Sequence, residues 1–102
     1  MKVTKKMRLV ADSHLVIPQE ELNKIDGNKR RRISVVITDP RSRHVVLTRY
    51  PENMAKVWYQ TTIERGSDFI PSAILKKAKI HEDKEFDINA TLNGNLIVRR
   101  RR

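Results

Sequence analysis

The chain has no cysteine and only three glycines among its 102 residues. The missing cysteine excludes disulfide bonds and cysteine-ligated zinc. The glycines, Gly27, Gly66 and Gly94, are too far apart to form a phosphate-cradling loop. No stretch approaches the roughly 18 unbroken apolar residues of a membrane helix, so we expect a soluble, cytoplasmic protein with no membrane partner.

The residue groupings that enzymes need are also missing. The histidines His14, His44 and His81 are scattered without metal-ligand spacing, and the serines carry no nucleophile motif. Aromatic residues make up 5% of the chain, so Tyr50, Trp58 and Tyr59 are expected to pack in the core and linker rather than on unpaired bases. We expect no enzyme, no cofactor and no metal.

Positive charge is the strongest compositional signal. The formal net charge is +10, from 22 basic and 12 acidic residues. Residues 1–50 hold 12 basic and 5 acidic residues, and residues 51–102 hold 10 and 7. Four of those ten form the terminal run Arg99–Arg102. Because an ordinary soluble domain mixes its charges more evenly, this balance favours a polyanionic partner over a merely solubilising surface.

The first half alternates predicted strands with one short helix. Pro18 suits the first turn of that helix, and Gly27 suits its C-terminal end. The elements expected from alternation, β-branched residues and turn residues are a strand over 3–11, a turn at 12–14, an apolar run at 15–17, a helix from Pro18, and a hairpin of strands 32–38 and 45–48 around a turn at 39–43.

The second half repeats this plan, with Pro71 in the place of Pro18. A linker at 50–53 and a brief helical turn at 54–56 are expected to precede it. Its expected elements are a strand over 57–64, a turn at 65–67, a helix after Pro71 with Ile74, Leu75 and Ala78 inward, and a hairpin over 86–98 turning at Asn93-Gly94.

These copies, about 1–50 and 57–102, are each near the lower limit for independent folding. We therefore expect a single domain over 1–102, mainly β with short helices, in which the two copies share one core by interleaving their strands. The basic tail 99–102 follows the second copy.

The stretch Arg65–Pro71, followed by Ile74, Ala78, Ile80 and the hairpin, resembles the swapped-hairpin AbrB/MazE/SpoVT domain. The first copy carries the same signature through Leu15–Pro18. The resemblance implies a double-stranded-DNA-binding, interleaved β-barrel built from two copies. Here both copies lie in one chain, an arrangement similar to that of MraZ-type proteins. It implies a single-chain pseudo-dimer and leaves open a homodimer of such chains.

The resemblance also implies which residues contact DNA, namely basic residues of the first strand, the turn and the helix. In this sequence they are Arg8, His14, Lys24, Arg65, Lys76 and Lys77. For the three lysines, a solvated helix face is an equally good interpretation.

The basic runs supply further candidates. Arg30, Arg31 and Arg32 are expected to attract phosphate without reading sequence. Arg41 and Arg43 frame a hairpin tip, where they either enter a groove or lie in water. Arg99 and Arg100 start a tail that is either an arm along the DNA backbone or a disordered end.

The sequence thus predicts a double-stranded-DNA-binding transcriptional regulator, associated with the nucleoid. One alternative is a non-specific DNA-coating protein. Another is an antitoxin-like or polymerase-binding protein-interaction module whose basic surface meets an acidic partner protein. The acidic residues of the second half, Glu82, Asp83, Glu85 and Asp87, motivate this last interpretation because they would oppose phosphate.

Overall fold

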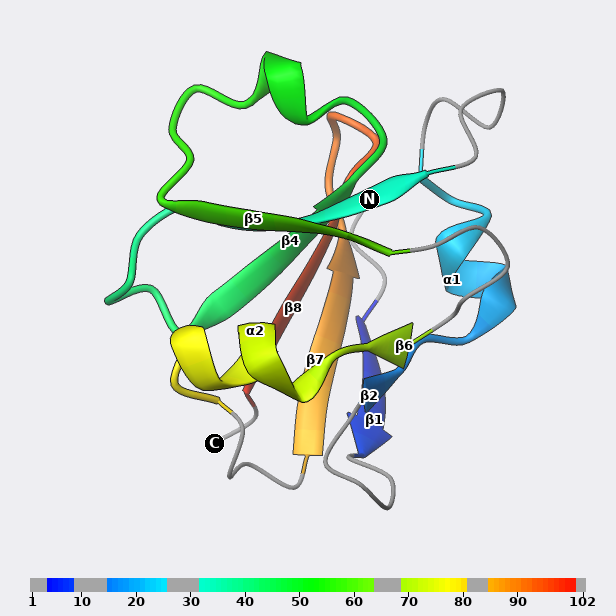
Figure 1. The fold of residues 1–102 in the computed structure, drawn as a ribbon. Coiled ribbons are helices and arrows are strands. Elements are labelled where there is room, and N and C mark those ends of the chain that lie inside the picture. Colours follow the sequence, from blue (N-terminus) through cyan, green and yellow to red (C-terminus); the bar gives the residue numbers. More distant parts are fainter. Residues whose placement is uncertain (1–3, 9–14, 26–31, 64–68, 81–84, 101–102) are drawn as a thin grey trace.

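The computed structural model describes residues 4–8, 15–25, 32–63, 69–80 and 85–100 (Figure 1). The elements in chain order are β1 (Thr4–Arg8), β2 (Leu15–Val16), α1 (Gln19–Leu22), β3 (Ile33–Ile37), β4 (His44–Thr48), the 3₁₀ turn η2 (Pro51–Asn53), β5 (Tyr59–Ile63), β6 (Phe69–Ile70), α2 (Ser72–Lys77), β7 (Glu85–Ala90) and β8 (Leu96–Arg100). Within these ranges, no helix is long and apolar enough to cross a membrane. The predicted mainly β fold with short helices is confirmed.

Six strands form one antiparallel sheet in the order β1-β7-β8-β4-β3-β5, and β2 pairs separately with β6. The edges of the larger sheet are β1 and β5. The described strands therefore form an open sheet, and the closed barrel implied by the resemblance is not formed by this ladder.

Strands of one half lie next to strands of the other at three places in this sheet. The first strand of the first half, β1, pairs with the hairpin strand β7 of the second half. The first strand of the second half, β5, pairs with the hairpin strand β3 of the first half. At the centre β4 pairs with β8. If β1 is exchanged with β5, β3 with β7 and β4 with β8, the strand order is therefore the same, read from the opposite edge of the sheet.

One apolar core collects side chains from both halves. Alternate residues of the central strands are fully or almost fully buried, including Val35, Leu47, Ile88 and Val98. The helical segments add Leu22 and Ile25 from the first half, and the predicted inward positions Ile74, Leu75 and Ala78 from the second. Each large apolar side chain buried in this way contributes about 1.5–3 kcal/mol, so the shared core binds the halves together.

Helix α2 ends in a hydrogen-bonded cap formed by Lys79 and Ile80. The N–H of Ile80 donates to the carbonyl of Leu75 at 3.0 Å, and the N–H of Lys79 donates to that of Lys76 at 3.0 Å. This is the pattern of a Schellman cap, and it places Lys79 in the left-handed region at φ 61°. Glycine is the usual residue there because its lack of a Cβ removes the steric cost.

The β7–β8 connection differs from the predicted two-residue Asn93-Gly94 turn. The N–H of Gly94 donates to the carbonyl of Thr91 at 3.1 Å, so the turn runs over 91–94. Gly94 takes φ 77° at its last position, where only glycine avoids a steric cost. This shift of one residue places Leu92 at the tip with 93% of its surface exposed.

The segment between the halves also departs from expectation. The helical turn lies at η2 rather than at 54–56, and Met54 is extended at φ −74°, ψ 132°. Strand β5 begins at Tyr59, so Val57 and Trp58 precede it, 42% and 50% exposed. Trp58 is therefore not a core residue and lies half exposed in the segment between the halves, whereas Tyr59 does pack against the core.

Candidate nucleic-acid interface

Several residues predicted to bind DNA lie outside the described residues. They are His14, Arg30, Arg31 and Arg65, and their assignment stays a prediction. Arg8 ends β1, where its Cα is in register with that of Glu85 on β7.

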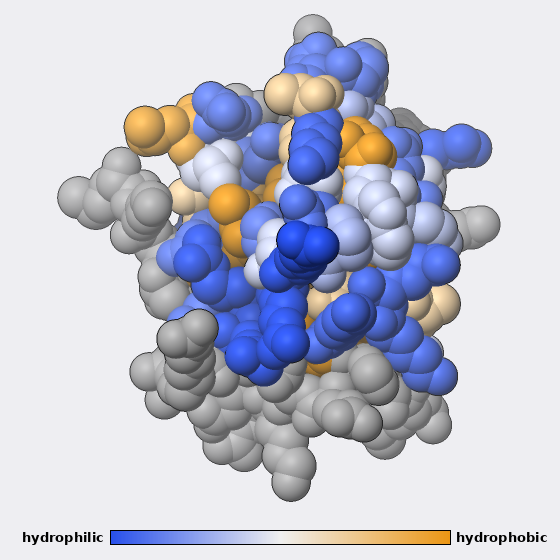
Figure 2. Space-filling view, turned by 90° about the vertical axis from the view of Figure 1, so that its left-hand side faces the viewer, coloured by the Kyte–Doolittle hydropathy of each residue, from blue (hydrophilic) through white to orange (hydrophobic). Residues whose placement is uncertain are grey.

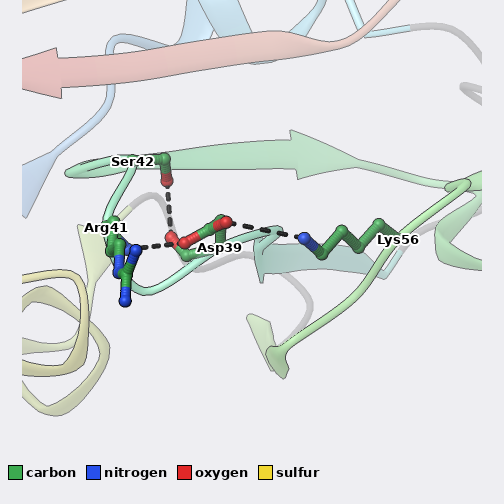
Figure 3. A network of polar contacts seen from close by, with 4 residues as sticks. All are labelled: Asp39, Arg41, Ser42 and Lys56. Carbon is green, nitrogen blue, oxygen red and sulfur yellow. Dashed lines mark hydrogen bonds and ion pairs between the residues drawn. The ribbon is translucent and has the colours of Figure 1, made fainter.

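The turn that carries Arg41 and Arg43 is held by Asp39 (Figure 3). Oδ1 of Asp39 accepts a hydrogen bond from the backbone N–H of Arg41 at 2.8 Å, and the Asp39 carbonyl accepts one from Ser42 Oγ at 2.7 Å. The N–H of Arg41 lowers the pKa of the Asp39 carboxyl below its usual value. Fixed by these bonds, the turn presents the exposed side chains of Arg41 and Arg43.

Strand pairing brings Arg99 to the same end of the sheet. On β8, Arg99 is in register with His44, which directly follows Arg43. Arg100 also belongs to β8 and lies opposite Phe86 on β7. Both arginines are therefore sheet residues, and the alternative of a disordered end is wrong for them, while their contact with the DNA backbone stays a prediction.

The surroundings of His44 lower the pKa of its imidazole. Burial lowers the pKa of its imidazole from the usual 6.5, a hydrogen bond with the Ser42 carbonyl partly offsets this shift, and the charge of Arg99 lowers the pKa further. The neutral ring is thus favoured beside two exposed arginines, Arg43 and Arg99.

Two lysines complete this end of the molecule. Lys56 Nζ lies 3.5 Å from Oδ2 of Asp39 in an exposed ion pair. Lys77 Nζ of α2 lies 4.6 Å from the centre of the Tyr59 ring, close enough for a cation–π interaction. Tyr59 itself is in register with Ile37, the last residue of β3 before the turn.

We call the surface formed by Arg41, Arg43, Lys56, Lys77 and Arg99 the basic side. In Figure 1 the β3–β4 turn and the end of α2 lie toward the left of the molecule. Figure 2 looks at that side and shows strongly hydrophilic side chains gathered across its middle. Exposed guanidinium and ammonium groups at such a surface suit sugar-phosphate contacts, which position a nucleic acid without reading its sequence. Lys76 of α2 is exposed as well.

The remaining predicted residues are not part of the basic side. Lys24 follows α1, at the right of Figure 1, and its Nζ lies 3.0 Å from Oε2 of the fully buried Glu21. Arg32 is exposed at the opposite end of β3 from the turn. The structure therefore divides the predicted contacts between two regions.

Arg49 is a candidate that the sequence analysis missed. Together with Arg32 it lines a hollow of about 440 Å³ on the face of the sheet opposite the core. A usable signal was present, because Arg32 and Ser34, like Gln60 and Thr62, are spaced two apart and so share one face of their strands. Only the pairing of β3 with β5 places these residues beside one another.

Comparisons with protein-family models, with curated proteins and with solved structures found no match.

Proposed function

We propose that the chain binds double-stranded DNA as a transcriptional regulator of swapped-hairpin, AbrB-like type, and that it acts on the nucleoid. The observation that carries this proposal is the exchange of strands between its halves, in which each first strand pairs with the hairpin of the other half. That exchange is what the resemblance to the swapped-hairpin family implies for two interleaved copies.

The register supports a two-fold relation between the copies. At the centre of the sheet Val46 lies opposite Ile97, flanked by the pairs of Val45 with Val98 and of Leu47 with Leu96. Inward residues of the same type therefore face each other across the two strands, valine opposite valine and leucine opposite leucine. A tandem pseudo-dimer built in this way suits a DNA site with approximate two-fold symmetry.

The basic side supports a nucleic acid as the partner. Its five cations come from four separate parts of the chain, and the fold brings them to one end of the molecule. The turn between β3 and β4 projects from this side, and a protruding turn with two arginines suits insertion into a groove.

The test is selection of bound sequences from random duplex DNA, followed by mobility shifts on the selected duplex, single-stranded DNA and RNA. We expect enrichment of a short, roughly two-fold site and an affinity that falls steeply with salt as counterions are released. Equal affinity for every duplex would instead identify a non-specific DNA-coating protein. Failure to bind any duplex would overturn the proposal.

One observation favours the protein-interaction alternative. Val57 and Trp58 are adjacent and exposed just before the edge strand β5, and tryptophan is enriched at the centres of protein interfaces. In this alternative, an antitoxin-like or polymerase-binding module would use these residues together with nearby Lys56 against an acidic partner protein. Capture of one defined protein after nuclease treatment, lost in a Trp58→Ala variant, would support it, and capture abolished by nuclease would exclude it.

A further inference from the structure

Three neighbouring strands carry a row of hydroxyl-bearing residues, two of which line the hollow together with Arg32 and Arg49. Ser34 on β3 is in register with Thr62 on β5 and with Thr48 on β4. Thr62 is exposed, whereas Ser34 and Thr48 are buried, with only 6% and 1% of their surface exposed. Ser34 and Thr62 both line the hollow, so hydroxyl-bearing residues of two neighbouring strands contribute to its wall.

Two guanidinium groups flank this row. Arg32 precedes Ser34 by two residues and is exposed, and Arg49 directly follows Thr48 and is half-buried. Gln60 adds an amide from β5. Guanidinium donors match the oxygens of a phosphate in pairs, and hydroxyl and amide groups supply further donors.

One carboxylate, that of Glu52, also lines the hollow. Its negative charge opposes an anion, so the two arginines and Glu52 leave a formal net charge of +1. The remaining positive charge attracts the anion of a phosphate, and Glu52 weakens this attraction without reversing it.

We propose that this hollow is a phosphate-binding site, with Arg32 and Arg49 as the paired donors and Ser34 and Thr62 beneath them. Its phosphate comes either from a nucleic-acid backbone, which rests on the proposed function, or from free phosphate. About seven residues of extended chain, roughly 20 Å, separate Arg32 from Asp39 of the turn. Because one turn of duplex spans about 34 Å, a single duplex reaches both the hollow and the basic side.

The first measurement is an amide NMR titration with sodium phosphate, compared with sodium chloride at equal ionic strength. Phosphate is expected to shift the amide signals of Ser34 and Thr62 more than chloride does. Arg32→Gln is expected to weaken phosphate binding about tenfold, whereas Glu52→Gln is expected to strengthen it a few-fold. Equal responses to the two anions, or no effect of either substitution, would overturn the site.

Half-buried Arg49 needs a variant that preserves packing. Arg49→Lys keeps the charge and most of the stem but loses the paired donors, so phosphate binding is expected to weaken about threefold with an unchanged amide spectrum elsewhere. The matched control is Lys79→Gln, which removes an exposed cation that belongs neither to the hollow nor to the basic side and is expected to leave phosphate affinity unchanged.

A second arm repeats the titration with a selected duplex. Loss of duplex affinity in Arg32→Gln, parallel to the loss for phosphate, assigns the site to the nucleic-acid backbone. Loss of affinity for phosphate alone, with duplex affinity unchanged, assigns the site to free phosphate. If the unchanged chain binds phosphate in the hollow but no duplex, the proposed function fails and the phosphate site stands.

Discussion

Val16 of β2 lies opposite Phe69 of β6, and each residue stands two positions before the proline that precedes its helix. The neighbouring pair, Leu15 with Ile70, extends this short ladder. The corresponding segments of the two halves thus pair with one another, as they do again at Val46 and Ile97. Half of the chain alone would leave these strands without their partners.

We therefore predict that fragments 1–53 and 54–102 do not fold as separate monomers and regain the native sheet when mixed. The reason is that β1 pairs with β7, β5 pairs with β3, and one core holds residues of both halves. Amide NMR spectra and sedimentation of each fragment and of the mixture provide the measurement. A short Gly-Ser insertion after Asn53 in the intact chain is the control and is expected to be tolerated. A native-like spectrum from a monomeric fragment would contradict the prediction.

Lys79→Gly is expected to stabilise the fold by about 1 kcal/mol, because it relieves the left-handed backbone at φ 61° while keeping the cap of α2. Thermal unfolding would then shift upward by about 5 °C. Lys76→Gly is the matched control: it places glycine inside α2 and should cost about 1 kcal/mol. A lower melting temperature for Lys79→Gly would show that the lysine side chain contributes more than its backbone strain costs.

The pairing of Lys24 with buried Glu21 predicts that Lys24→Gln destabilises the fold by about 1–2 kcal/mol, since a carboxylate with no exposed surface loses a charged partner. The exposed pair of Lys56 with Asp39 is the control, and Lys56→Gln should leave stability almost unchanged because solvent screens this pair. Urea unfolding measures both. If the two variants lose the same stability, the pair of Lys24 with Glu21 contributes no more to the fold than an exposed ion pair does. The salt dependence of duplex binding by the same variant tests the predicted phosphate contact of Lys24.

The basic side gives a prediction about salt. Arg41→Gln is expected to reduce the slope of log affinity against log salt by about 0.9, the contribution of one phosphate contact to duplex binding. Arg41→Lys keeps the charge and should keep the slope. The backbone of the turn is unaffected, because Asp39 bonds to the N–H of residue 41 rather than to its side chain. An unchanged slope for Arg41→Gln would remove the turn from the interface.

The sequence was sufficient where local patterns determine structure. The spacing of Ile74, Leu75 and Ala78 placed the buried face of α2 correctly. The β-branched runs placed β3 and β4, and the turn at 39–43 was also recognised. Each of these features depends on neighbours within a few residues along the chain.

What the sequence could not supply depends on pairing between distant segments. Arg99 and Arg100 read as a charged tail, and only their register with β4 and β7 makes them strand residues. Thr48, Ser34 and Thr62 form a row only because β3 pairs on both sides. The prediction of a two-residue turn at Asn93-Gly94 was wrong for a different reason. Glycine also suits the last position of a longer turn, and the Asn-Gly dipeptide does not distinguish the shorter turn from the longer one.

The lowered pKa of His44 predicts that the free energy of unfolding falls in mild acid. Its pKa is lowered from 6.5 in the folded state, first by burial and then by Arg99, so below about pH 6.5 the unfolded chain binds more protons at this residue than the folded chain does. The free energy of unfolding should therefore decrease as the pH falls from about 6.5 through the lower pKa of the folded state, and His44 should contribute no pH dependence above that window. Urea unfolding at about pH 7.5 and about pH 5.5, with an NMR titration of the ring, provides the measurement. His44→Gln should weaken the acid dependence, and Arg99→Gln should raise the His44 pKa. A titration of His44 at or above 6.5 would mean that its ring is more hydrated, and farther from Arg99, than this fold places it.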